Sequence, residues 1–178
     1  MKRALISAIL VLAGLACSTL QTSYDYDKSV NFSQYKTWAL KDDGSIKNPL
    51  LFKRFEAAVT DEMTKKGLTR NDDNPDLWVA AHTRLSKETQ INTYDTGWGY
   101  GYGWRGGYYG GGGMTTSTVS EIPVGTLIVD LVDAKRKELA WRGQATDTLN
   151  PNSSPQEKET NLKAAIAKMF ENYPPPAK

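Results

Sequence analysis

Residues 125–143 read GTLIVDLVDAKRKELAWRG, and the predicted architecture extends outward from them. Two runs rich in β-branched and aliphatic residues, Thr126–Asp133 and Leu139–Thr148, flank the polar segment Asp133–Lys137. Such residues favour strands, and a short polar turn between two strands is typical of an antiparallel pair. The stretch therefore predicts a β-hairpin.

A second hairpin is predicted upstream of the first. Asp76–Asn92 alternates apolar and polar residues, which is the period of a strand with one buried face. The residues expected on that face are Leu77, Val79, Ala81 and Leu85. Met114–Val124, rich in Thr, Ser and Val, is the predicted second strand of this hairpin. Two shorter strands are predicted near Ser23–Asp27 and at Thr37–Leu40.

Two amphipathic helices are also predicted. The first begins at Asn48, a good N-cap, with Pro49 at the first helical position, and it ends at Gly67. The second begins at Ser154, where Ser-Pro-Gln-Glu forms a capping box, and it ends before Pro174. The apolar residues at helical spacing are Leu51, Phe55, Ala58, Val59 and Met63 in the first helix, and Leu162, Ala165, Ile166, Met169 and Phe170 in the second.

The order of these elements defines the expected fold class. Two helices lie among five or six strands, and the strands are joined mainly by hairpins. A helix and a sheet each bury one apolar face, so they pack in layers. We therefore expect an α+β fold: a two-layer sandwich with a mostly antiparallel or mixed sheet and both helices on one face.

The N-terminus predicts export and lipid modification. Lys2 and Arg3 precede the apolar run Ala4–Ala16, which is too short to cross a bilayer of about 30 Å and has the length of a secretory signal. The run ends at Cys17, the only cysteine in the chain. We expect residues 1–16 to be removed and Cys17 to become the lipid-modified first residue. The alternative is an ordinary secretory peptide that is cut elsewhere.

The expected lipid anchor determines the predicted cellular location and the domain boundaries. A diacylglycerol and an N-acyl chain on Cys17 would supply the several acyl chains that stable anchoring requires, and no other cofactor is expected. Residues 17–23 then form a tether, and residues 24–178 form a single domain. Ser18 follows the cysteine in place of the Asp associated with inner-membrane retention. The expected location is therefore the outer membrane, with the domain facing the periplasm.

The charge balance argues against nucleic acid as a partner. The intact chain has 22 Lys and Arg against 20 Asp and Glu, with a pI near 8.5. Two of the positive charges, Lys2 and Arg3, belong to the predicted leader, so the remaining chain has 20 against 20. A protein with no net cationic charge lacks the field that attracts phosphate backbones.

Residues 97–113 form a glycine- and aromatic-rich tract. Ten of its seventeen residues are glycine, and the others are aromatic or Arg105. Glycine loses much entropy on ordering, so we expect a long loop at the tip of the hairpin. Its rings could contact glycan, membrane or a partner protein, and the plain alternative is a low-complexity spacer. The aromatic residues in question are Trp98, Tyr100, Tyr102, Trp104, Tyr108 and Tyr109.

Candidates for catalysis and metal binding are few. His82 is the only histidine, and strand alternation turns it away from the apolar face, so no two-histidine metal site exists. Asp130 and Asp133 are the best-placed carboxylates for glycan hydrolysis, but their opposite parity places them on different faces of a regular strand. Residues 71–76 are rich in oxygen ligands but lack the glycine and distal glutamate of a calcium loop. We therefore expect no catalytic residue and no metal site.

Several short motifs, taken in order, resemble one family of proteins. They are Asn31–Trp38 (NFSQYKTW), Lys66-Gly67, Pro75-Asp76-Leu77, Gly125–Asp133, Trp141-Arg142-Gly143 and Tyr173-Pro174-Pro175. Their order and spacing, from Tyr24 to Pro175, resemble the bacterial envelope lipoproteins grouped as domain of unknown function 4136. The resemblance implies an α+β lipoprotein with no assigned activity, and it carries over no catalytic residues.

These observations predict a non-enzymatic, lipid-anchored envelope protein that binds or scaffolds a periplasmic partner. The expected contacts are the membrane through the lipid, and peptidoglycan or another envelope protein. The alternative is an envelope hydrolase that acts on glycan through Asp or Glu residues.

Overall fold

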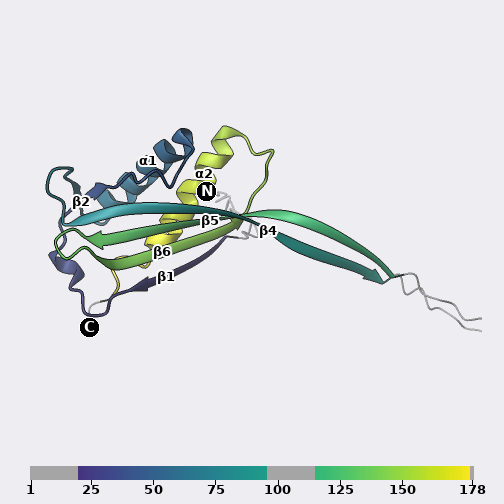
Figure 1. Ribbon diagram of the computed structural model, residues 1–178, viewed down its shortest axis with the longest axis horizontal. Helices are drawn as coiled ribbons and strands as arrows, with labels where there is room; N and C mark the ends of the chain where they lie inside the picture. The colour runs from purple at the N-terminus through teal and green to yellow at the C-terminus, as the bar shows by residue number, and fades with distance from the viewer. Residues whose placement is uncertain (1–19, 96–114, 177–178) are drawn as a thin grey trace, which may run out of the picture.

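The computed structural model describes residues 20–95 and 115–176, with side chains for 20–89 and 119–176. Within these residues the chain forms six strands, two α-helices and one short 3-10 helix (Figure 1). In chain order they are β1 (Gln21–Tyr26), η1 (Phe32–Gln34), β2 (Thr37–Leu40), α1 (Pro49–Lys65), β3 (Thr69–Arg70), β4 (Leu77–Asp95), β5 (Thr115–Asp133), β6 (Glu138–Thr148) and α2 (Pro155–Phe170).

All six strands belong to one mixed sheet, in the order β1-β6-β5-β4-β2-β3. The pairs β1/β6, β6/β5 and β5/β4 are antiparallel, whereas β2 is parallel to both β4 and β3. The parallel pairs arise because α1 follows β2 and returns the chain to the same end of the sheet. The predicted α+β sandwich with a mixed sheet is therefore confirmed.

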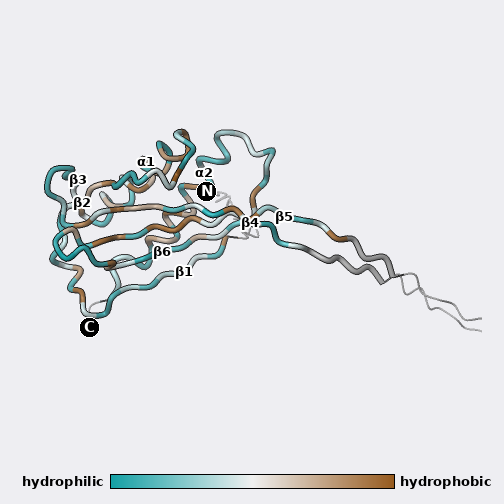
Figure 2. Tube along the Cα trace, viewed as in Figure 1, coloured by the Kyte–Doolittle hydropathy of each residue, from teal (hydrophilic) through white to brown (hydrophobic). Residues whose placement is uncertain are grey.

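Both helices cover the same face of the sheet, and the opposite face is open (Figure 1). The core fills the space between the two layers, and hydrophobic segments of the trace converge there (Figure 2). Its largest fully buried side chains are Trp38, Trp141, Phe55, Phe170 and Met63. Burial of such side chains is worth about 1.5–3 kcal/mol each, so this layer is the main source of stability.

The helix ends follow from their capping residues, as predicted. Asn48 accepts hydrogen bonds from the backbone N–H groups of Leu50 and Leu51, which begins α1. Gly67 has φ +78° and ends α1, because glycine adopts this left-handed conformation without steric cost. In α2, the Ser154 hydroxyl and the Glu157 carboxylate complete the predicted capping box.

Strand β5 differs from the sequence-based expectation. Residues 114–124 and 126–133 were expected to be separate strands of two hairpins, but β5 is one strand of nineteen residues that pairs with β4 along its whole length. Pro123 does not break it. The Pro123 carbonyl accepts from the N–H of Leu149, just beyond the end of β6. The backbone polar groups of residue 123 therefore point away from β4, and the missing N–H of the proline does not interrupt the β4–β5 pairing.

As a consequence, β4 and β5 extend beyond the body as a two-stranded ribbon (Figure 1). Strand β6 accompanies β5 only as far as Val124, whereas the β4–β5 pairing continues from Ser86–Val124 to Asp95–Thr115. At about 3.3 Å per residue, this ribbon is about 30 Å long. The prediction that Leu85 is buried is wrong: its side chain is 78% exposed, because it lies where the strand leaves the core.

Candidate functional site

Two groups of predicted contact residues lie outside the described residues. Cys17 precedes the described part of the chain, and the tract 97–113 with its six aromatic residues falls in the gap between β4 and β5. The sequence nevertheless relates both to described positions. Cys17 is three residues before Leu20, and the tract joins Asp95 to Thr115, the last paired residues of the ribbon.

His82 lies on the open face of the sheet, as its parity predicted. Its Nδ1 is 3.0 Å from Ser45 Oγ, and its Nε2 is 3.8 Å from Asp130 Oδ2. Both carboxylate oxygens of Asp130 accept from Arg142, at 2.6 Å from Nε and 2.6 Å from Nη2. A serine, a histidine and an aspartate therefore lie together, but the aspartate is held by a bidentate arginine and is too distant to hydrogen-bond the imidazole.

Asp133 stabilises the turn between β5 and β6. It accepts from the backbone N–H groups of Lys135 and Arg136 at 2.9 and 2.8 Å, and from the Tyr35 hydroxyl at 2.9 Å. Burial by itself raises the pKa of Asp133, but hydrogen bonds from the Arg136 backbone and the Tyr35 hydroxyl more than offset it. The pKa therefore lies below its ordinary value. Asp133 is an ionised structural carboxylate.

The two candidate carboxylates do not form a catalytic pair. Asp130 contacts Arg142 on the open face, whereas Asp133 contacts Tyr35, which is part of the core cluster on the helix side. A glycosidase requires one carboxyl group to donate or accept a proton and the other to act on the sugar or a water. Each of these aspartates instead has both oxygens engaged by protein donors.

The oxygen-rich residues 71–76 are engaged in local structure. Asn71 accepts from the backbone N–H groups of Asp73 and Asn74. One Asp76 oxygen accepts from Lys36 N, Thr37 N and Thr37 Oγ1, which joins the turn to the start of β2. These bonds lower the pKa of Asp76, the contact with the Lys36 N–H having the largest effect. In the described part of the chain, no group of three or more His, Cys, Asp and Glu could hold a metal ion.

A groove that the sequence did not predict lies at the end of the body where β1 finishes. Its volume is about 650 Å³, within the range of about 300–1,000 Å³ typical of small-molecule sites. Three chain segments meet there: residues 26–36, residues 66–68 after α1, and residues 173–176 after α2. Hereafter we call it the end groove.

Aromatic rings form the floor of the end groove. Phe32 makes edge-to-face contacts with Tyr26, Tyr35 and Tyr173, with ring centroids 5.8–6.1 Å apart. Tyr35 and Tyr173 are buried, whereas Tyr26 and Phe32 are only half-buried and so present part of their rings to solvent. Burial raises the pKa of Tyr173, which keeps its hydroxyl neutral.

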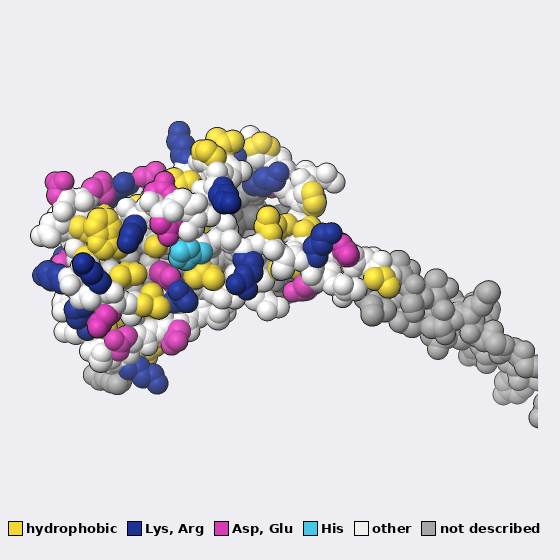
Figure 3. Space-filling model, in the orientation of Figure 1, with side chains coloured by type: hydrophobic (Ala, Val, Ile, Leu, Met, Phe, Trp, Pro, Cys, Tyr) yellow, Lys and Arg dark blue, Asp and Glu magenta, His cyan; other side chains and the backbone are white. Residues whose placement is uncertain are grey.

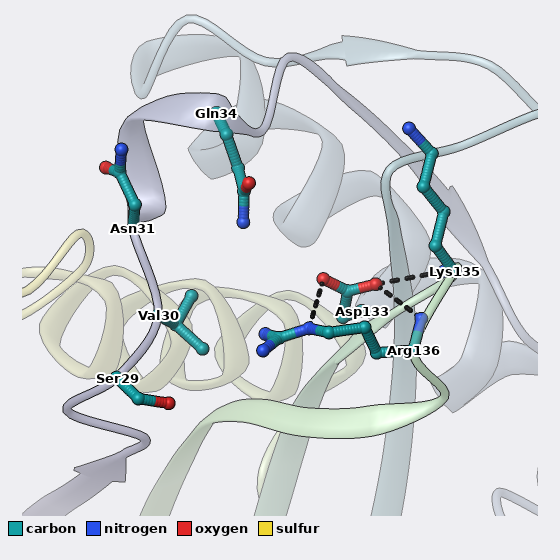
Figure 4. A pocket seen from close by; sticks show the side chains of 7 residues that line it. All are labelled: Ser29, Val30, Asn31, Gln34, Asp133, Lys135 and Arg136. Atoms are coloured by element: carbon teal, nitrogen blue, oxygen red, sulfur yellow. Dashed lines mark hydrogen bonds and ion pairs between the residues drawn. The ribbon is translucent and has the colours of Figure 1, made fainter.

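A smaller hollow of about 390 Å³ adjoins the end groove and shares Ser29, Val30 and Asn31 with it. Figure 4 shows Val30, Gln34 and Arg136 pointing into this hollow, with Asp133 at its base. Arg136 Nε donates to Asp133 at 3.1 Å, and the interaction with Asp133 raises the pKa of Arg136. The hollow therefore holds a permanent guanidinium beside a carboxylate that is already hydrogen-bonded.

No acidic side chain in the described ranges pairs with the lysines of the end groove. Lys28, Lys36 and Lys66 line it, and among the described residues none of the three has an acidic partner within 4 Å. Lys28 and Lys36 are exposed, and Lys66 is half-buried. By contrast, the open sheet face shows hydrophobic side chains interspersed with both positive and negative groups (Figure 3). The end groove therefore combines partly exposed aromatic surface with lysines that have no acidic partner in residues 20–95 and 115–176.

These features define the protein as an α+β domain with a one-sided helical layer, a projecting ribbon and a groove at the opposite end. In the described residues, no helix has the length and apolar character needed to cross a bilayer. The chain belongs to the family described as Domain of unknown function (DUF4136), which matches residues 22–175. The resemblance inferred from the short motifs is thus confirmed.

Three solved structures align with most of this chain. A PDZ domain protein from Parabacteroides distasonis ATCC 8503 aligns with TM-score 0.55 and 17% identity over 90% of this chain, which spans only 36% of that protein. A PelC dodecamer from Paraburkholderia phytofirmans gives 0.48 and 13% identity over 85% of this chain and 94% of that one. A minor lipoprotein from Acinetobacter baumannii gives 0.37 and 11%, covering 78% and 88%. No curated protein matches the sequence.

Proposed function

We propose that this protein is a lipid-anchored, non-enzymatic binding protein of the bacterial envelope. In this proposal Cys17 carries the acyl chains, the anchor lies in the outer membrane, and the body faces the periplasm. The body binds an envelope component, and the tract 97–113 is presented by the ribbon as a second contact for glycan, membrane or a partner protein. Family membership and the signal-peptide-like N-terminus support a location in the cell envelope.

The observation that carries the binding role is the chemistry of the end groove. Its lining consists of aromatic rings, prolines, lysines and small polar residues. The carboxylate that lines the adjoining hollow, Asp133, already accepts from Tyr35 and the turn N–H groups. These groups suit the recognition of a ligand, whereas hydrolysis requires a carboxylate that is free to exchange a proton.

Co-sedimentation with purified peptidoglycan sacculi tests the proposal. The protein from Ser18 onward retains every described element, so it can be used in soluble form. It is compared with a variant that lacks residues 97–113. We expect the protein that contains the tract to pellet with sacculi. If the variant without residues 97–113 stays in the supernatant, the tract is a glycan contact. Absence of pelleting for both forms would remove peptidoglycan as the partner.

The same sacculi samples test the enzymatic alternative. Soluble fragments released during incubation would reveal hydrolysis, and their loss in Asp130→Asn or Asp133→Asn, with the fold intact, would identify the carboxylate responsible. We expect no fragments from the unmodified protein, because Arg142 and the turn N–H groups hold these carboxylates. Measurable release would contradict the non-enzymatic assignment.

A further inference from the structure

We propose that the end groove and its adjoining hollow bind an anionic glycan, meaning a chain of sugars that carries carboxylate or phosphate groups. This inference deepens the proposed binding function and rests on it. It assigns a ligand class to the described body, independently of the tract 97–113.

The charges of the groove favour an anionic ligand. Lys28, Lys36 and Lys66 enter it from two different segments, and none is neutralised by an acidic side chain in the described part of the chain. The nearby acids are already occupied. Asp27 accepts from the Ser29 N–H and hydroxyl, and Asp133 accepts from the turn. An approaching anion would therefore meet ammonium groups for which the described residues supply no competing acidic partner.

The rings and polar side chains of the groove favour a sugar over an acidic peptide. Phe32 and Tyr26 offer partly exposed aromatic surface, on which the apolar face of a sugar ring can stack. Ser29 and Ser33 also line the groove; their hydroxyls donate to Asp27 and Asn31 and can still accept a hydrogen bond from a ligand. Gln34 points into the adjoining hollow (Figure 4). Alternating ring faces, hydroxyl groups and charges are the features that a charged saccharide presents along its length.

The layout of the two hollows favours an extended chain. The two hollows, of about 650 and 390 Å³, share Ser29, Val30 and Asn31 in their linings and therefore lie side by side. In the second hollow a ligand would reach the guanidinium of Arg136, which points into the hollow (Figure 4). Its Nε donates to Asp133, and its Nη1 lies 3.6 Å from Glu138 Oε2. A linear glycan with an acidic group on successive sugars would thus meet lysine first and arginine second.

Binding is tested with the full-length protein in detergent, by calorimetric titration with oligogalacturonate and with maltooligosaccharide of the same length. The first probe carries one carboxylate per sugar and the second carries none. We expect oligogalacturonate to bind, maltooligosaccharide to bind at least about tenfold more weakly, and the difference to shrink as salt is raised. Equal binding of the two probes would overturn the proposal.

Two variants of equal charge locate the site. Lys28→Gln/Lys36→Gln/Lys66→Gln removes the groove lysines, and Lys47→Gln/Lys53→Gln/Lys158→Gln removes three exposed lysines that line neither hollow. We expect the groove variant to lose about tenfold or more in affinity and the control variant to be unchanged. Equal losses in both would mean non-specific charge attraction and would overturn the site.

Two further readouts separate this inference from the proposed function. Phe32→Leu keeps an apolar side chain but removes the ring, and we expect it to weaken the binding of oligogalacturonate. The acidic peptide oligoglutamate serves as the second probe. The glycan assignment would be overturned if oligoglutamate bound as tightly as oligogalacturonate and Phe32→Leu changed neither affinity. In each case the oligosaccharide is recovered and its length measured. Shortened products would contradict the non-enzymatic function, whereas intact glycan that does not bind would contradict only the ligand class.

Discussion

Gly143 lies beneath two side chains of the core. A Cβ at this position would collide with Trp141 Cη2 and Met169 Cγ, so the absence of a side chain allows the tryptophan ring and α2 to approach the sheet. We expect Gly143→Ala to lower the free energy of unfolding by about 1–3 kcal/mol, measured by urea denaturation, because it overpacks a fully buried site.

The matched control is Gly125→Ala, which lies on β5. A Cβ there would meet only the Leu149 side chain, at 3.0–3.2 Å, and Leu149 is 39% exposed and can move. The control should have a much smaller effect. Equal destabilisation by both substitutions would show that loss of glycine, and not the contact with Trp141 and Met169, is responsible.

Asp133 makes stability depend on pH. Its pKa is lower in the folded protein than in the unfolded chain, so the ionised group contributes stability above the unfolded value, and this contribution is lost as the pH falls through the folded value. We expect Asp133→Asn to destabilise the protein by about 1–3 kcal/mol at neutral pH, and by less below about pH 4. Urea denaturation at pH 7 and pH 3 measures both. Asp61 is an exposed residue on α1, and Asp61→Asn should leave the free energy of unfolding unchanged at both pH values. A loss of stability in Asp133→Asn that is the same at pH 7 and pH 3 would contradict a role for its ionised form.

At the scale of the elements, the ribbon is independent of the core. Replacing residues 87–123 by Asn-Gly would join Ser86 to Val124, which are paired neighbours, through a two-residue hairpin turn. Among the described residues it removes one backbone hydrogen bond to the rest of the body, from the N–H of Leu149, which follows β6, to the Pro123 carbonyl. We expect the free energy of unfolding to change by no more than about 1 kcal/mol. A large loss would mean that the ribbon supports the body.

The elements were predictable where local chemistry determines them. Asn48, Gly67 and Ser154 specify the helix ends, and alternation specifies β4 and the β5–β6 hairpin, since both depend on neighbours in sequence. The continuity of β5 was not predictable in this way, because Pro123 and Gly125 favour a break and only the ending of β6 makes the proline acceptable. Leu85 was misplaced for the same reason: alternation gives the face of a strand but not where the core ends.

The candidate site was less predictable than the fold. The solvent-facing position of His82 followed from parity. The end groove, however, is assembled from residues 26–36, 66–68 and 173–176, which only tertiary packing brings together. The sequence did offer a partial signal, since aromatic residues and lysines are concentrated around Tyr26–Lys36. Nothing local indicated that Tyr173 would join them.

At the scale of the whole molecule, the ends of the body differ. Strand β1 begins level with the base of the ribbon. The pairing runs across the sheet from Gln21 in β1 to Thr146 in β6, Thr126 in β5 and Arg84 in β4. Tyr26 ends β1 at the end groove, about 17 Å from Gln21. Cys17 is three residues before Leu20 and reaches only about 10 Å further. A lipid on Cys17 would therefore hold the ribbon base near the membrane and leave the groove further from it.

Fluorophores at two serines test this orientation. Ser86→Cys and Ser29→Cys place a label on exposed positions at the ribbon base and at the end groove, respectively. In vesicles that carry a quencher on the lipid headgroup, we expect stronger quenching at position 86 than at position 29. Cys17→Ser should abolish membrane association and all quenching. Equal quenching at both positions would contradict the orientation, and retention of Cys17→Ser on the membrane would contradict the anchor.

The unbroken course of β4 and β5 has a mechanical consequence. The two strands at the centre of the sheet are the same two that form the ribbon, and no hinge interrupts their pairing from Leu77–Asp133 to Asp95–Thr115. A force applied at the far end of the ribbon is therefore transmitted along the backbones of β4 and β5 to the middle of the body.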